Sequence, residues 1–232
     1  MNPEEQRISE EAFQHVKSHF DEVIQKFASQ SIPVATPVSL FMAGSPGAGK
    51  TEVSKGLMRQ FETVPVRIDA DEIRAMCPAY TGANAHLFQR AATKGVHILY
   101  DHALHKKLHL ILDGTFAYSD SIKNIQRSLD YGRKAELWFV YQDPVKAWAF
   151  TQAREALETR HVSKDFFIKT FLMAKENTKQ AKMHFGTSLT LNLLIKNIDN
   201  TDGKMQLNIQ HDQLDPHIGQ SYTAEELGRI LV

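Results

Sequence analysis

Apolar residues near the start of the chain recur at a spacing of three or four. The positions on this spacing are Phe13, Val16, Phe20, Val23, Ile24 and Phe27. Such spacing is typical of one face of a helix, so we expect an amphipathic helix over residues 9–29. Ser9 can cap it, and the proline-containing segment 31–37 predicts a linker. We therefore treat residues 1–35 as an N-terminal helix with its linker and residues 36–232 as the main domain.

Short apolar runs alternate with helical spacing from residue 38 onward. The runs predict strands over residues 38–42, 64–68, 108–112 and 136–141. Helical spacing occupies residues 50–61, 86–105, 119–130, 145–159 and 165–183. This alternation predicts an α/β fold, with a parallel β-sheet flanked by helices on both faces. Ligands of such sheets bind beyond the carboxyl ends of the strands.

The end of the chain has a different pattern. Two strand-like runs, 189–196 and 204–210, flank an Asn- and Gly-containing turn at 199–203. This arrangement predicts a C-terminal β-hairpin. Residues 223–231 have the spacing of a short closing helix.

Composition and charge narrow the class of protein. Among 232 residues, Lys plus Arg and Asp plus Glu both number 27, so the formal net charge is zero and a nucleic-acid partner is disfavoured. Cys77 is the single cysteine, so an intrachain disulfide is excluded, as suits a reducing compartment. The polar N-terminus lacks signal-peptide character and no run of 18 apolar residues occurs. We therefore expect a cytoplasmic protein without a membrane partner.

A glycine-rich motif follows the first predicted strand. It reads Gly44, Ser45, Pro46, Gly47, Ala48, Gly49, Lys50 and Thr51. This pattern matches a phosphate-binding loop, whose backbone N–H groups surround the phosphates of a nucleotide. Lys50 would reach the β- and γ-phosphates and Thr51 would bind magnesium, so ATP and Mg²⁺ are the expected cofactors.

Acidic residues follow the next two strands. Asp69 and Asp71 come directly after the run 64–68, and Asp113 closes the run 108–112. A carboxylate beside the phosphate loop can accept the proton of an attacking hydroxyl. We assign this role to Asp71 and expect Asp69 to cap a helix. Asp113 would hold magnesium through water or contact the acceptor, although an Asp before Gly114 is also common in turns.

Cations follow the fourth strand, in the helical stretch that contains Arg154 and in the segment with Arg160. Phosphoryl transfer needs positive charge near the transferred group. A solvated helix face is the more common setting of any single arginine, so their role rests on the family resemblance below.

The motifs together resemble the zeta toxin family, P-loop kinases of bacterial toxin–antitoxin systems. The resemblance is carried by the phosphate loop, by residues 67–71, by residues 112–115 and more weakly by residues 159–164. It extends over roughly residues 38–210 and implies the fold of a P-loop kinase. Members phosphorylate a hydroxyl of a UDP-N-acetylated amino sugar, so the resemblance implies a nucleotide-sugar acceptor and an antitoxin partner.

The same resemblance assigns roles to individual residues. Lys50 would orient the phosphates, Asp71 would be the catalytic base, and Arg160 and Arg154 would stabilise the transferring group. The acceptor would be bound by Asp71, His97, Asp113 and Thr115. The chain differs from the family at three of these places. It has Asp113 where the family usually has Glu, Phe116 and Ala117 where an Arg often follows, and His97 where an acid is common. All three differences are at positions that would contact the acceptor, so they bear on which acceptor the protein uses.

Two other functions remain open from the sequence. The first is a kinase that acts on another acceptor, such as a nucleoside, NAD or a polynucleotide end. The second is an ATP-binding switch that transfers no phosphoryl group. A switch hydrolyses nucleotide without an acceptor. This property distinguishes it from a nucleotide-sugar kinase and from a kinase of another acceptor.

Overall fold

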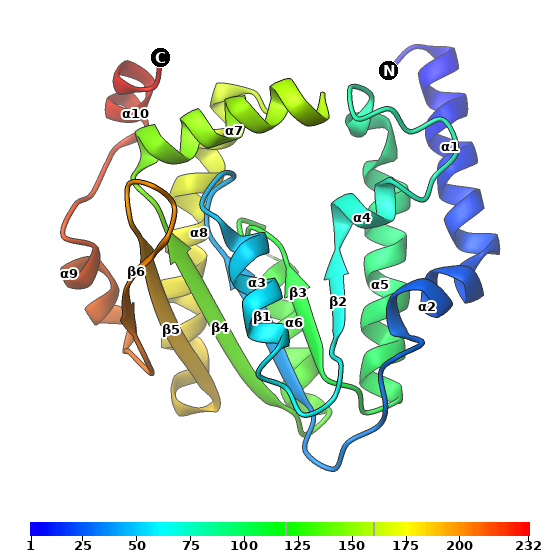
Figure 1. Ribbon diagram of the computed structural model, residues 1–232, viewed down its shortest axis with the longest axis horizontal. Coiled ribbons are helices and arrows are strands. Elements are labelled where there is room, and N and C mark those ends of the chain that lie inside the picture. The colour runs from blue at the N-terminus through cyan, green and yellow to red at the C-terminus, as the bar shows by residue number, and fades with distance from the viewer. Residues whose placement is uncertain (119, 160) are drawn as a thin grey trace.

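The computed structural model describes residues 1–118, 120–159 and 161–232. Its centre is a six-stranded sheet in the order β2-β3-β1-β4-β5-β6 (Figure 1). The strands are β1 (Val38–Ala43), β2 (Val66–Asp69), β3 (Leu110–Asp113), β4 (Lys134–Tyr141), β5 (Leu189–Lys196) and β6 (Asp202–Gln206). Strands β1 to β5 pair in parallel, and β6 pairs antiparallel to β5. The predicted α/β fold with a late hairpin is confirmed.

Helices cover both faces of the sheet. In Figure 1, α3 (Lys50–Met58) lies in front of the sheet, and α6 (Asp120–Asp130) and α8 (Lys164–Phe185) lie behind it. Side chains of a strand point alternately to the two faces. Leu40 and Met42 of β1 accordingly pack with Val53 and Leu57 of α3. Phe41 belongs to the larger core on the opposite face.

The N-terminal segment forms two helices, α1 (Pro3–Ser18) and α2 (Phe20–Ala28), instead of the single predicted helix. The predicted Ser9 cap is wrong, because Asn2 caps α1 and forms a reciprocal capping box with Glu5. The backbone at His19, with φ −108° and ψ 36°, separates the two helices. Both pack against α5 (Gln89–His105), so the helical periodicity is confirmed.

Helix α7 (Pro144–Glu158) runs across the carboxyl ends of the strands (Figure 1). The hydroxyl of Thr159, at its end, donates to the carbonyl oxygen of Thr81 at 2.9 Å. Thr81 lies in the loop after α4 (Ala70–Arg74) and before the 3₁₀ turn Ala85–Phe88. This contact joins the end of α7 to the loop after α4, beside the carboxyl ends of the strands where the predicted site residues lie.

The C-terminal region completes the fold. The expected second strand of the hairpin ends at Gln206, and a short helix, α9 (Leu214–Ile218), precedes the predicted closing helix α10 (Ala224–Ile230). Two further 3₁₀ turns, Gly186–Ser188 and His211–Gln213, join these elements. Leu227 of α10 is fully buried and packs with residues of α7 and α8.

Across the described ranges 1–118, 120–159 and 161–232, none of the helices combines the length and the apolar character that a membrane span needs.

Candidate functional site

The phosphate loop connects β1 to α3, as its motif predicts. Gly44 and Gly47 have φ values of +142° and +70°, which favour glycine. A Cβ atom on Gly47 would lie 2.0 Å from the carbonyl oxygen of Ala147 in α7, so a larger residue does not fit there. The N–H of Gly44 donates to the carbonyl oxygen of Thr115 at 3.1 Å. The loop is thus fixed between α7 and the end of β3.

Lys50 and Thr51 begin helix α3 directly after the loop. The ammonium of Lys50 donates to the carbonyl oxygen of Ser45 at 2.6 Å, so the side chain folds back over its own loop. The helix N-terminus adds the positive end of its dipole. Lys50, Thr51 and the N–H groups of the loop therefore favour an anion at this point.

A cleft of about 760 Å³ opens beside the loop. The predicted site residues that line it are Pro46, Gly47, Gly49, Lys50, Thr51, Asp71, Asp113, Thr115 and Arg154. Gly44, Ser45 and Ala48 belong to the loop but are not among the lining residues. His97 is exposed on α5 and is also not among them. The predicted Arg160 lies outside the described residues.

Asp71 lies on the first turn of α4, where Asp69 caps the helix. The Asp69 carboxylate accepts the backbone N–H of Asp71 at 2.9 Å, which confirms the capping prediction. Arg74, one turn later, forms a hydrogen-bonded ion pair with the Asp71 carboxylate. Gln89 accepts a second Arg74 N–H at 2.5 Å. Arg74 is buried, so α4 and α5 together hold the Asp71 carboxylate at the wall of the cleft.

Asp113 occupies a buried network beneath the phosphate loop. One of its carboxylate oxygens accepts from Ser54 at 2.7 Å and from Arg67 at 2.5 Å. Arg67 also pairs with Asp69 at 2.7 Å and with Glu72 at 2.5 Å. Burial alone would lower the pKa of Arg67, but the charges of Asp113, Asp69 and Glu72 outweigh it and raise that pKa. The network ties the ends of β2 and β3 to α3.

The wall of the cleft that α7 contributes is largely apolar, apart from Thr151 and Arg154. It contains Phe150 and Leu157 of α7, together with Val162, which precedes α8, and Phe166 in the first turn of α8. Leu157 is 85% exposed. The cleft therefore combines an anion-binding floor and an acidic wall with a largely apolar wall that also carries Arg154.

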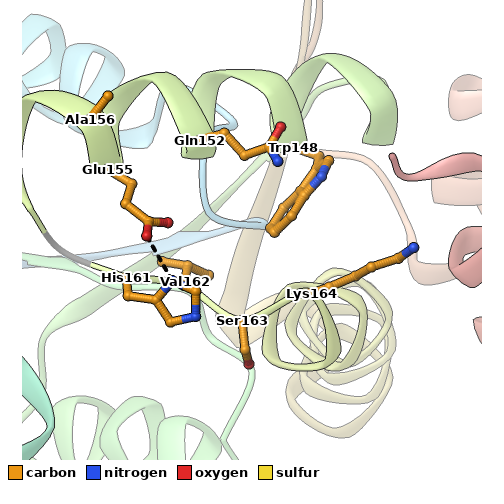
Figure 2. A pocket seen from close by; sticks show the side chains of 8 residues that line it. All are labelled: Trp148, Gln152, Glu155, Ala156, His161, Val162, Ser163 and Lys164. Carbon is orange, nitrogen blue, oxygen red and sulfur yellow. Dashed lines mark hydrogen bonds and ion pairs between the residues drawn. The ribbon is translucent and has the colours of Figure 1, made fainter.

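A second, shallower pocket of about 610 Å³ lies between α7 and the first turn of α8 (Figure 2). Glu155 accepts from His161 at 2.7 Å at one side of it. At the other side, Lys164 donates to the carbonyl oxygens of Gly228 and Leu231 at 2.8 and 2.5 Å. Val162 lines both this pocket and the cleft. The segment 161–163 therefore lies between the two spaces.

Several polar residues at or near the cleft were not predicted as site residues. Among them are Arg67, Arg74, Gln89 and Asn200. Arg74 follows Asp71 by three residues, and that spacing on a helix could have indicated the pair. Arg67 pairs locally with Asp69 and Glu72, but its pair with Asp113 spans 46 residues and has no local signal. Gln89 and Asn200 have no local signal either, because they lie against Arg74 and Gly49, which belong to other segments.

Comparison with known proteins identifies the family. The model of the family described as zeta toxin matches residues 21–205. A comparison with curated proteins gives no match. The structure from the PezAT chromosomal toxin–antitoxin system of Streptococcus pneumoniae is similar, with a TM-score of 0.69 at 18% identity, covering 94% of this chain and 91% of that chain.

A second similar structure is the AvrRxo1-ORF1:-ORF2 complex with ATP. Its TM-score is 0.62 at 15% identity, and the match covers 96% of this chain and 75% of that chain. At such low identity both structures support the fold. The match of the family model over most of the chain, together with the phosphate loop at the edge of a parallel sheet, shows that the chain belongs to the zeta toxin family of P-loop kinases.

Proposed function

We propose that the protein transfers the γ-phosphoryl group of ATP to a hydroxyl of a nucleotide sugar such as UDP-N-acetylglucosamine. The observation that carries this proposal is that Asp71 and the phosphate-binding residues Lys50 and Thr51 line one cleft. A kinase needs a carboxylate beside the phosphates to accept the hydroxyl proton, and a nucleotide switch does not need this group.

Each group of residues in the cleft has a separate role in the proposed reaction. The loop N–H groups and Lys50 hold the phosphates. The acceptor oxygen forms a bond to the γ-phosphorus while the bond to the bridging oxygen of ADP breaks, and Asp71 takes the proton of the hydroxyl. Arg154 lies on the wall contributed by α7, where its charge would stabilise the transferring oxygens. Arg160 would add a second cation, and Asp113 and Thr115, which line the cleft, would bind the acceptor. His97 lies outside the lining residues, so we do not assign it a contact to the acceptor.

Magnesium is the metal that this set of residues would accept. Thr51 and Asp113 both line the cleft and offer the oxygen donors that Mg²⁺ prefers. Because one Asp113 oxygen already accepts from Ser54 and Arg67, we assign Asp113 a contact to magnesium through water. Bound magnesium would neutralise charge on the phosphates.

An antitoxin protein is the proposed macromolecular partner. The similar structure from Streptococcus pneumoniae is described as part of a toxin–antitoxin system, and the AvrRxo1 structure is a complex of two proteins. The proposed place of action is the cytoplasm, where both ATP and nucleotide sugars occur.

Transfer of label from γ-labelled ATP tests the function. The protein is incubated with Mg²⁺ and separate acceptors: UDP-N-acetylglucosamine, other nucleotide sugars, nucleosides, NAD and RNA ends. The Asp71→Asn variant keeps an oxygen that can accept from Arg74 but loses the base. We expect it to bind ATP and to transfer label at least a hundredfold more slowly.

The matched control is Asp130→Asn, which changes an exposed carboxylate outside the lining residues. It should transfer label like the wild type. Label on a different acceptor would replace the proposed substrate. Release of phosphate without any labelled acceptor, unchanged in Asp71→Asn, would contradict the kinase.

A further inference from the structure

The turn between β5 and β6 reaches the phosphate loop. Asn200 of this turn lines the cleft, although it lies 149 positions after Thr51 in the sequence. A Cβ atom on Gly49 would lie 3.0 Å from the Asn200 Oδ1 atom and 3.4 Å from its Nδ2 atom. The carboxamide therefore lies against the last glycine of the loop. In Figure 1 the β5–β6 turn likewise approaches the segment that leads into α3.

The other polar side chains of this turn are used within it. The Asp199 carboxylate accepts from the N–H and the hydroxyl of Thr201 at 3.0 and 2.6 Å. The Asn197 carboxamide donates to the Thr201 hydroxyl at 3.0 Å. Lys196, which precedes the turn and is itself buried, donates to Asp202 at 2.8 Å. These bonds fix the turn without the side chain of Asn200.

The Asn200 carboxamide has no hydrogen-bond partner among the residues that the structure describes. Its Oδ1 atom is nevertheless buried. A buried amide oxygen without a partner is costly, and a carboxamide can offer two donors and an acceptor oxygen to a ligand. The backbone of Asn200 has φ +66°, a conformation that glycine adopts more easily. Turn geometry accounts for the conformation at this position, but it leaves the carboxamide unexplained.

The position of Asn200 in the sheet indicates which part of a ligand it meets. Asp71, the proposed base, follows β2 at one edge of the sheet, and Asn200 follows β5 near the other edge, with the phosphate loop between them. In phosphoryl transfer the attacking and leaving oxygens lie roughly in line on opposite sides of the phosphorus. If the acceptor approaches from the Asp71 side, the ADP portion extends toward the β5–β6 side.

We infer that Asn200 binds the nucleoside portion of ATP through its side-chain carboxamide. A carboxamide offers both a donor and an acceptor, which complements the amino group and ring nitrogen of adenine. The inference rests on the proposed function, because the in-line argument assumes transfer to an acceptor bound beside Asp71. Asn200 is thus a further determinant of nucleotide affinity that is separate from the phosphate loop.

Direct binding measurements test this role without any acceptor. Isothermal titration calorimetry compares ATP with inorganic tripolyphosphate, each with Mg²⁺, on the full chain. Asn200→Gly keeps the positive φ and removes the carboxamide. We expect it to weaken ATP binding about three- to thirtyfold, equivalent to one or two hydrogen bonds, and to leave tripolyphosphate binding unchanged.

Asn208→Gly is the matched control. Asn208 also has a positive φ, +50°, but it is not among the residues that line the cleft, so both affinities should stay as in the wild type. Asn200→Ser, which removes the carboxamide without adding a charge beside the phosphate loop, should weaken ATP binding as well and leave tripolyphosphate binding unchanged. If circular dichroism shows that the glycine variant does not fold, the serine variant provides the test.

Two results would overturn the inference. One is wild-type ATP affinity in the Asn200 variants, and the other is an equal loss of ATP and tripolyphosphate, which would assign the side chain to the phosphate loop. A wild-type protein that binds ATP but labels no acceptor would refute the proposed function, and the affinities would still decide the role of Asn200.

Discussion

At the scale of single residues, the cleft is organised by two buried arginines. Arg67 joins Asp69, Glu72 and Asp113 beneath the phosphate loop, and Arg74 joins Asp71 to Gln89. Buried guanidinium groups are tolerated where carboxylates and polar oxygens surround them, because desolvation of an unpaired charge is costly. Asp71 therefore has its orientation set by a side chain that is itself fixed by α5.

Arg74→Met tests this positioning. Without the guanidinium the Asp71 carboxylate loses a fixed partner, and we expect kcat for transfer to fall about tenfold to a hundredfold. The KM for ATP should stay near the wild-type value. Arg74→Lys should give an intermediate kcat, because an ammonium keeps the charge but does not reproduce the fork that reaches both Asp71 and Gln89.

Arg90→Met provides the control, since Arg90 lies on the same helix as Gln89 but pairs with Glu10 and is half-exposed. Its kcat should not change. If kcat of Arg74→Met equalled that of the wild type while the variant remained folded, Arg74 would have no positioning role.

At the scale of elements, the site depends on a close approach of α4 to α5. Gly95 lies in the middle of α5, and a Cβ atom there would be 2.6 Å from the Cγ2 atom of Ile73 and 3.5 Å from the Cγ1 atom of Val16. Ile73 is fully buried on α4, beside the residues that carry the predicted chemistry. Glycine at this point lets α1, α4 and α5 pack against one another.

Two glycine-to-alanine changes separate packing from helix propensity. Gly56 lies in α3 with no atom within 4 Å of its would-be Cβ, so Gly56→Ala should stabilise the fold by about 0.5–1 kcal/mol. Gly95→Ala should instead destabilise it by about 1–3 kcal/mol, because overpacking outweighs propensity. Urea unfolding measures both values. A Gly95→Ala protein as stable as Gly56→Ala would refute the close packing.

At the scale of the whole molecule, the cleft collects segments from most of the chain. Residues after β1, β2, β3 and β5 and residues on α7 line it. A ligand that binds all of these segments in the folded state, and not in the unfolded chain, stabilises the whole domain.

Thermal unfolding with and without ATP measures that coupling. At about a hundred times its Kd, ATP with Mg²⁺ should add about 2.7 kcal/mol to the free energy of unfolding. Lys50→Ala should lose most of this gain while unfolding like the wild type without ATP. Lys134→Ala, at an exposed position of β4, should keep it. An equal gain in Lys50→Ala and wild type would place ATP outside the phosphate loop.

Much of the fold could be predicted from local signals. Strands β1 and β5 and helices α7 and α8 lie within two residues of their predicted bounds, because apolar periodicity depends on which face of each element is buried. The N-terminal break at His19 has no comparable signal, since the periodic apolar positions continue through it. Packing of two helices against α5 decides that break.

The residues of the candidate site likewise divide into those that local sequence signals predict and those that only tertiary packing brings together. The order of residues along the chain determined the phosphate loop, because its glycines and Lys50 act within eight consecutive positions. It also determined that Asp69 begins a helix, since capping acts over two residues. Tertiary structure decided that Arg67 pairs with Asp113 across 46 residues, that Gln89 holds Arg74, and that Asn200 lies against Gly49. These contacts join segments that are distant along the chain, and the packing of the sheet and helices brings them together.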